Sequence, residues 1–208
     1  MLRLHGYLAS INVRKILWLC EELGLKVELA ERGTPAFPVS DPEFVRKSPF
    51  GLVPLLEDGN FLLSESNTAL RYLVRKQGRS DLLPDEAKAA AMVERWIDWQ
   101  ATDFNDSWRY AFISQVRKLP GYDDPGLILR SQIAFNGKMK ILNDQLASTS
   151  AYVAGSEFTL ADVPIGVSVR RWIAMNFEKP DFPDVLRYYE LLCHRKAFLW
   201  FGGPESPV

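Results

Sequence analysis

The first 78 residues alternate between strand-like and helix-like spacings of their hydrophobic positions. Residues 2–5 and 27–30 are short apolar runs that predict two strands. Between these runs, hydrophobic side chains recur at i, i+3, i+4 and i+7, which is the spacing of one helical face: Val13, Ile16, Leu17 and Cys20. The order strand, helix, strand predicts a parallel pair of strands joined by a right-handed crossover.

A hairpin follows in the same pattern. Two apolar runs, 53–57 and 60–63, are separated by Asp58 and Gly59, and an Asp-Gly pair in this position is a strong signal for a tight turn. Residues 66–75 then return to the helical period. Because the hairpin adds antiparallel pairing to the parallel pair, residues 1–78 predict a mixed sheet of βαβ–ββα order.

Strand signals largely disappear after residues 79–86, which are typical of a linker. Hydrophobic residues then follow the helical period on a helix that begins near Ala87, on a second over 128–146 and on a last one over 182–192. We therefore expect two domains, an α/β domain over 1–78 and an all-helical domain over 87–208.

Composition and charge exclude several classes of function. Hydrophobic residues make up 47% of the 208 positions and charged residues 25%, which is an ordinary globular balance. The formal net charge of -1 offers no footprint for nucleic acid and no polybasic patch for a membrane surface. We find neither an apolar stretch of about 18 residues nor the apolar core of a secretory signal, so we expect a cytoplasmic protein.

Metal and nucleotide motifs are missing from the sequence. His5 and His194 are the only histidines, Cys20 and Cys193 are the only cysteines, and neither CxxC nor HExxH spacing occurs. Glycine-rich phosphate loops and a GxSxG nucleophile elbow are absent as well. We therefore expect no metal and no resident cofactor.

Ser10 and Asn12 lie at the junction of the first predicted strand and the first predicted helix. The start of a helix carries unpaired N–H groups and a partial positive charge. A hydroxyl at that point can donate a hydrogen bond to a thiolate and keep it ionised. The simpler interpretation is that Ser10 or Asn12 caps the helix.

A second group of candidates surrounds the hairpin. Pro54 stands at the start of a strand, where it costs no ladder hydrogen bond, and a cis bond after Val53 would turn that backbone toward an extended peptide ligand. Beyond the hairpin, the amide of Ser66 at a helix start can bind a carboxylate, and Glu65 can pair with an ammonium group. The alternatives are a trans proline and an ordinary helix cap.

Thr159 and Asp162 have the spacing of a capping box, with Asp in place of the commoner Glu or Gln. We interpret this pair as structural, a folding signal for a buried helix, rather than as part of a reactive site.

Three stretches, in this order and spacing, resemble the cytosolic glutathione transferase family over nearly the whole chain: HGYLASINVRKILWLCEELGL, SPFGLVPLLEDGNFLLSESNTALRYL and FTLADVPIG. The resemblance implies a thioredoxin-like N-terminal domain packed on an all-helical C-terminal domain. It implies a homodimer, whose interface would use the helices that begin at Ser66 and Ala87. Glutathione would be a co-substrate rather than a cofactor.

The resemblance also suggests which residues activate the glutathione sulfur. By position, Ser10 would supply the activating hydroxyl, and Asn12 is a second candidate because some bacterial-type members use an amide there. Tyr7 does not stand at the usual catalytic tyrosine position. Cys20 lies inside the predicted helix, which disfavours a cysteine-type transferase.

For glutathione itself, the resemblance implies that the backbone of Val53, beside a cis Pro54, pairs with the cysteinyl unit. Glu65 and Ser66 would hold the γ-glutamyl end. Many family members place a polar residue just before the Val-Pro pair, whereas this chain has Leu52.

Residues 32–42 depart from the family pattern as well, because they lack the glycine-rich sequence of similar bacterial proteins. Arg32 or Lys47 is a candidate for holding the glycyl carboxylate in place of that segment.

The second domain would supply an apolar wall for a small hydrophobic electrophile. Trp108, Tyr110, Phe112 and Ile113 are the candidates, with Trp172 farther along the chain. The alternative is that these side chains belong to the ordinary core of the helical domain. The leading hypothesis is therefore a glutathione transferase. A glutathione-dependent disulfide reductase or peroxidase on the same fold, and a non-catalytic binding module, remain as alternatives.

Overall fold

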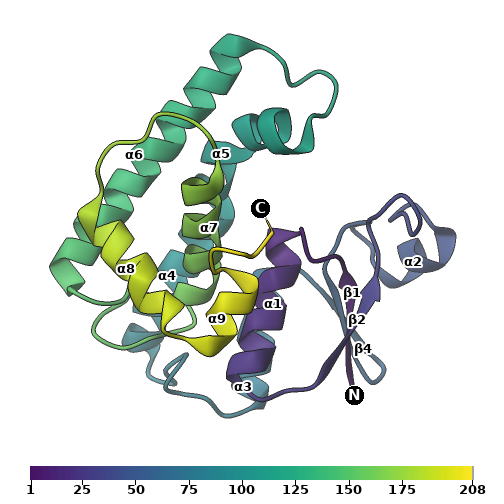
Figure 1. The fold of residues 1–208 in the computed structure, drawn as a ribbon. Coiled ribbons are helices and arrows are strands. Elements are labelled where there is room, and N and C mark those ends of the chain that lie inside the picture. The colour runs from purple at the N-terminus through teal and green to yellow at the C-terminus, as the bar shows by residue number, and fades with distance from the viewer. Residues whose placement is uncertain (208) are drawn as a thin grey trace.

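A computed structural model describes residues 1–207. Its N-terminal half contains one four-stranded sheet in the order β2-β1-β3-β4 (Figure 1). The strands are β1 (Leu2–Gly6), β2 (Val27–Glu31), β3 (Leu55–Asp58) and β4 (Phe61–Ser64). β1 pairs with β2 in parallel and with β3 in antiparallel orientation, and β3 pairs with β4 across the hairpin. The predicted mixed sheet is confirmed.

Three helices accompany the sheet: α1 (Ile11–Glu22), α2 (Pro42–Lys47) and α3 (Ser66–Lys76). α1 packs against α3, and it lies between the sheet and the helices of the second half (Figure 1). The sequence predicted one buried face for α1, but every residue from 13 to 20 is buried. The difference arises because the second half covers the side of α1 that faces away from the sheet.

The second half is helical, as predicted. It contains α4 (Ala87–Trp99), α5 (Asn105–Phe112), α6 (Pro125–Thr149), α7 (Asp162–Ala174), α8 (Pro183–Cys193) and α9 (Lys196–Phe201). Two π-helical segments, Gln100–Phe104 and Ile113–Arg117, extend α4 and α5. The pattern did not predict α9, which packs on α1 and connects the C-terminal end of the chain to the N-terminal domain (Figure 1).

Asp162 begins α7 in the middle of this helical domain and is fully buried. Its carboxylate accepts hydrogen bonds from the amide of Thr159 at 2.8 Å, the amide of Val153 at 3.0 Å and the hydroxyl of Tyr188 at 3.0 Å. Burial raises the pKa of Asp162 to about 6, and these donors act in the opposite direction. The geometry agrees with the structural interpretation of the Thr159–Asp162 pair.

Residues 1–207 include no helix with the length and apolar character that a membrane crossing requires. The same residues include no cluster of His, Cys, Asp and Glu side chains placed to hold a metal ion. Cys20 is buried, Cys193 is half-buried, and both are free thiols.

Candidate active site

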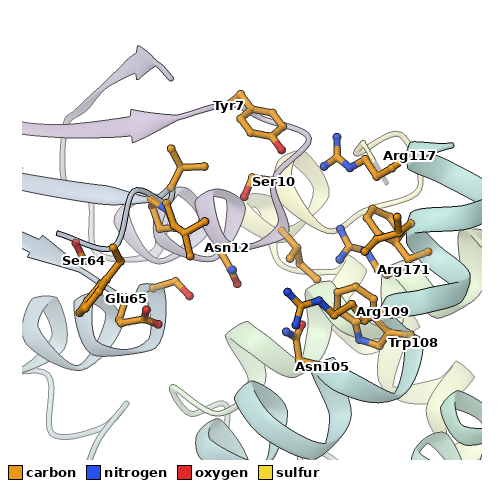
Figure 2. A pocket seen from close by; sticks show the side chains of 18 residues that line it. Tyr7, Ser10, Asn12, Ser64, Glu65, Asn105, Trp108, Arg109, Arg117 and Arg171 are labelled. Atoms are coloured by element: carbon orange, nitrogen blue, oxygen red, sulfur yellow. The ribbon is translucent and has the colours of Figure 1, made fainter. Parts of the chain in front are cut away.

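A cavity of about 430 Å³ lies between the two halves of the chain (Figure 2). One wall comes from the N-terminal domain: from the β1–α1 junction, from the loop before β3 and from the turn between β4 and α3. The opposite wall comes from α5, the π-helical segment after it and α7. The volume lies in the range typical of small-molecule sites.

Ser10 is the residue that precedes α1, with its backbone in an extended conformation. Its carbonyl oxygen accepts the first helical hydrogen bonds, from the amides of Val13 and Arg14 at 3.1 Å each. Its side chain, however, makes no capping hydrogen bond. The capping interpretation of the Ser10 hydroxyl is therefore wrong, and this half-buried hydroxyl lines the cavity instead.

Asn12 is the second residue of α1, so it does not occupy the position before the helix that the capping interpretation needs. Its side chain lines the same cavity as Ser10, and both come from the N-terminal end of α1 (Figure 2). A ligand atom placed between them lies beside the unpaired amides and the partial positive charge of this helix end.

The Val53–Pro54 peptide bond is cis. Val53 precedes β3, and within residues 1–207 no backbone hydrogen bond uses its amide or carbonyl group. Both residues line the cavity. The Val53 backbone is therefore available to an extended ligand.

Glu65, next to the start of α3, has φ of 68° and ψ of 109°, a conformation that residues other than glycine rarely adopt. Strained backbone of this kind costs roughly 1–3 kcal/mol and tends to occur at binding sites. Ser66 follows as the first residue of α3, where its amide is one of the unpaired helix-start donors. The Oγ of Ser64 is buried without a hydrogen-bond partner. All three residues line the cavity (Figure 2).

Lys15 lies beneath this wall and is buried. Its ammonium group donates to Oδ1 of Asn67 at 3.1 Å and to Oε1 of Gln100 at 2.8 Å, and Gln100 donates in turn to Ser168 at 3.0 Å. Burial lowers the pKa of Lys15 to about 7, and the charge of Arg171 adds to the lowering. This polar network joins α1, α3, the π-helical segment after α4, and α7.

Aromatic side chains form the opposite wall. Trp108 and Phe112 line the cavity and pack edge to face, with ring centroids 5.5 Å apart. The guanidinium carbon of Arg171 lies 4.4 Å from the ring centroid of Trp108 and 3.8 Å from that of Phe112. Arg117 lies over the rings of Tyr7 and Phe112 at 5.5 and 5.4 Å. The predicted aromatic residues Trp108 and Phe112 lie in this wall, which also carries the guanidinium groups of Arg109, Arg117 and Arg171.

Arg171 is 2% exposed. Within residues 1–207 it forms no ion pair, and its Nε has no hydrogen-bond partner. Burial lowers its pKa well below the ordinary value, and the charges of Arg14 and Arg117 add to that effect. Nε1 of Trp108 is likewise a buried donor without a partner. This end of the cavity is therefore electropositive, and Arg171 has no protein counterion among the described residues.

Two of the predicted electrophile-site residues lie elsewhere. Of the described residues, those that line the cavity include Trp108, Phe112 and Ile113 but not Tyr110. The ring of Tyr110 packs on Tyr122, because its position on α5 turns it toward the loop before α6. Trp172 is buried in the bundle, packed against Phe182, with its indole N–H donating to Asn136 at 2.9 Å. The core interpretation is correct for Trp172.

The two candidates for holding the glycyl carboxylate do not line the cavity within the described chain. Arg32 pairs with Asp41 at 2.9 Å and lies over the ring of Phe44. Lys47 is within 3.9 Å of Glu43, one helical turn away on α2.

The sequence did not identify several further cavity residues, among them Tyr7, Asn105, Arg109, Arg117 and Arg171. One signal was available for Arg171. It lies four residues after Val167 and eight after Val163, on a face of α7 that is buried along its length. A charged residue on the apolar face of a helix is uncommon and often marks a site. Arg117 and Tyr7 carried no comparable signal.

The chain is similar to several known proteins. Residues 1–75 match the family model described as glutathione S-transferase, N-terminal domain. Glutathione S-transferase GstB of Escherichia coli K12 is 30% identical over 95% of both chains. Elongation factor 1-gamma 1 of Oryza sativa is 28% identical over 94% of this chain and 47% of its own length. Among solved structures, the theta class glutathione S-transferase of Xanthomonas axonopodis pv. citri with glutathione bound superposes with a TM-score of 0.90, at 29% identity over 100% of this chain and 99% of that one.

Proposed function

This chain belongs to the glutathione S-transferase family, and we propose that it transfers the sulfur of glutathione to small electrophiles through the cavity described above. One observation carries the proposal: the Ser10 hydroxyl is free of any capping role and lines the cavity at the N-terminal end of α1. In the proposed reaction, the glutathione thiolate attacks an electrophilic carbon. The C–S bond forms, and the leaving group departs with its electron pair.

The thiolate would be held by three groups of donors. The Ser10 hydroxyl donates a hydrogen bond to sulfur, and the N-terminal end of α1 supplies a partial positive charge. Asn12 offers an amide donor on the same side of the cavity. The charges of Arg117 and Arg171, which line the same cavity, favour the ionised sulfur further, since an opposite charge lowers the pKa of an acid.

The tripeptide would lie along the N-terminal wall. The unpaired backbone groups of Val53, beside Pro54, would pair with the cysteinyl unit. The amide and hydroxyl of Ser66 would bind the γ-glutamyl carboxylate, and Glu65 would pair with its ammonium group. The strained backbone of Glu65 favours this role, because such strain persists where a site depends on it.

A homodimer in the cytoplasm is part of the proposal. The interface would use α3 and α4, and two copies would be related by a two-fold axis, as in most homo-oligomers. Sedimentation at micromolar concentration should give a species of about twice the 23.7 kDa subunit mass. A single species at the subunit mass would contradict the dimer without affecting the transferase proposal.

Two alternatives remain to be separated from the transferase. A disulfide reductase or peroxidase would use the same Ser10 site with glutathione as reductant. Its own thiol would not be Cys20, because burial raises the pKa of Cys20 to about 12. A non-catalytic module is suggested by the elongation factor 1-gamma relatives, whose names do not describe a transferase.

The deciding experiment measures three properties of the purified protein. Titration calorimetry with glutathione tests binding. Turnover of 1-chloro-2,4-dinitrobenzene tests conjugation, and turnover of the mixed disulfide of glutathione and 2-mercaptoethanol tests reduction. We expect binding and conjugation. Reduction without conjugation would support the reductase, and the absence of both activities would support a non-catalytic module.

A further inference from the structure

We propose that the second substrate carries an anionic group, such as a carboxylate, on an aromatic or other flat apolar body, and that Arg171 binds this anion with the help of Arg117. The inference rests on the proposed function, and it narrows the electrophile class that the sequence suggested. A purely hydrophobic electrophile would leave the charged end of the cavity unused.

Arg171 is buried, and within residues 1–207 it has no counterion. A buried charge is costly unless it is paired and hydrogen-bonded. Arg171 is 2% exposed, forms no ion pair within residues 1–207 and lines the cavity. Its Nε is enclosed by protein, whereas its two terminal nitrogens are not fully enclosed, and within residues 1–207 no hydrogen bond uses them. Buried polar groups are almost always satisfied in native proteins, so these terminal N–H groups point to a ligand that accepts hydrogen bonds.

The surroundings of Arg171 are positively charged. Arg109 and Arg117 line the cavity together with Arg171, and within the described chain the acidic lining residue is Glu65 on the opposite wall (Figure 2). Arg14 lies behind them and donates to the carbonyl of Phe201 at 3.0 Å rather than to a carboxylate. A cation cluster of this kind raises the local concentration of anions and disfavours cations.

The guanidinium group of Arg171 packs against the aromatic wall. The rings of Trp108 and Phe112 lie 4.4 and 3.8 Å from its guanidinium carbon. These rings attract the cation but carry no carboxylate or carbonyl oxygen that would accept its N–H donors. Those donors remain free for a carboxylate, which a guanidinium binds with two parallel hydrogen bonds. The same rings offer apolar surface to the flat body that carries the carboxylate.

The wall opposite Ser10 therefore sets the direction of the substrate. With its carboxylate at Arg171, the reactive carbon of an aryl halide would face the N-terminal end of α1. The thiolate attacks the ring carbon that bears the halogen, the C–S bond forms, the C–halogen bond breaks, and halide leaves with the electron pair. The carboxylate takes no part in the bond changes.

Binding without turnover tests the inference, so that its failure is distinguishable from failure of the transferase proposal. The probes are 3,5-dinitrobenzoate and its methyl ester, which differ in charge and carry no leaving group on the ring. Affinity is measured by titration calorimetry, with and without saturating S-methylglutathione. We expect the wild-type protein to bind the carboxylate at least about tenfold more tightly than the ester, because a hydrogen-bonded charge pair contributes that much or more.

Arg171→Met removes the charge and keeps an apolar side chain of similar length. It should weaken carboxylate binding about 10- to 100-fold and leave ester binding within about threefold. Arg171→Lys should recover part of the affinity, because lysine keeps the charge but loses the two-pronged geometry. Arg130→Met, at an exposed position on α6, makes the same change in net charge away from the cavity and should alter neither affinity. Arg117→Met gives a second measurement, with a smaller loss for the carboxylate.

Two results would overturn the inference. One is equal binding of the acid and the ester by the wild-type protein. The other is an equal loss of both probes in Arg171→Met with an unchanged melting temperature, which would show that the residue only packs the aromatic wall. If Arg171→Met does not fold, the Arg117→Met comparison decides by the same criterion: the carboxylate must lose affinity and the ester must not.

Discussion

Replacement of Ser10 by alanine removes one hydroxyl from the cavity and should leave the fold intact. The Ser10 side chain makes no capping hydrogen bond to α1, so the usual cost of losing a cap, about 0.5–2 kcal/mol, does not apply. We expect the free energy of unfolding to change by less than about 0.5 kcal/mol, as for a neutral substitution. The variant therefore separates the chemistry of the site from its stability.

The effect on the sulfur follows from the loss of one donor to an anion. A hydrogen bond to a charged group is worth about 1.5–3 kcal/mol, and one pKa unit corresponds to about 1.4 kcal/mol. The pKa of bound glutathione should therefore rise by roughly 1–2 units in Ser10→Ala. Turnover near neutral pH should fall about 10- to 100-fold, and the deficit should shrink at high pH, where the thiol ionises without help.

The assay is the ultraviolet absorbance of the thiolate in the glutathione complex, titrated with pH, alongside the pH dependence of kcat/KM. Glutathione affinity should change little, because Val53, Glu65 and Ser66 would provide most of the binding. Asn12→Ala is the matched control on the same end of α1. A wild-type complex with an unshifted thiol pKa would refute the mechanism. A normal Ser10→Ala beside a crippled Asn12→Ala would assign the activating role to Asn12.

Two predictions concern the frame around the site. Asp162→Ala should lower the free energy of unfolding by about 3 kcal/mol or more, because it leaves several buried donors unpaired. Thr159→Ala, which keeps the amide contact to Asp162, should cost no more than about 1 kcal/mol; equal losses in urea denaturation would contradict the network. Burial lowers the pKa of Lys15 from 10.5 to about 7. Between these two pH values the unfolded chain binds one more proton than the folded chain. The free energy of unfolding should therefore rise with pH, by at most about 1.4 kcal/mol per pH unit. Lys15→Met should abolish this rise between pH 7 and 9, and an unchanged slope would exclude Lys15 as its source.

The sheet and the first helices could be predicted because their signals are local. The Asp58-Gly59 turn fixes the hairpin through neighbouring residues, and the period from Val13 to Cys20 marks a helix without reference to the rest of the chain. The depth of burial of α1 could not be predicted in the same way. It depends on α7 and α9, which are more than 100 residues away in the sequence.

The candidate site, too, has parts that can be predicted from the local sequence and parts that cannot. Ser10, Val53, Glu65 and Ser66 lie at junctions between elements, and such junctions can be located from the sequence pattern. Whether the Ser10 hydroxyl caps α1 or faces the cavity is a matter of side-chain geometry that the local sequence leaves open. The opposite wall depends on which turn of α5 faces the N-terminal domain.

On that wall, a difference of one or two positions decides between cavity and surroundings. Trp108 and Phe112 lie four residues apart on one face of α5 and reach the cavity, whereas Tyr110 lies between them and faces the loop before α6. Because all three residues are aromatic, the sequence predicted all three in the wall of the electrophile site. The helical period separates them, but only when one member of the face is already known to reach the site.

Arg117 and Arg171 would act on the thiolate of bound glutathione through their charge rather than through direct contact. A thiolate and a carboxylate about 6 Å apart repel each other by about 3 kcal/mol at an effective dielectric constant near 20. A cavity that accepts both anions therefore needs fixed positive charge to offset this repulsion. Arg117 and Arg171 provide it from one side, and the partial positive charge at the N-terminal end of α1 provides it from the other. Each anionic ligand that enters the cavity reduces the free-energy cost of burying the arginines beside it. A buried guanidinium without a protein counterion is therefore compatible with a site for an ionised sulfur.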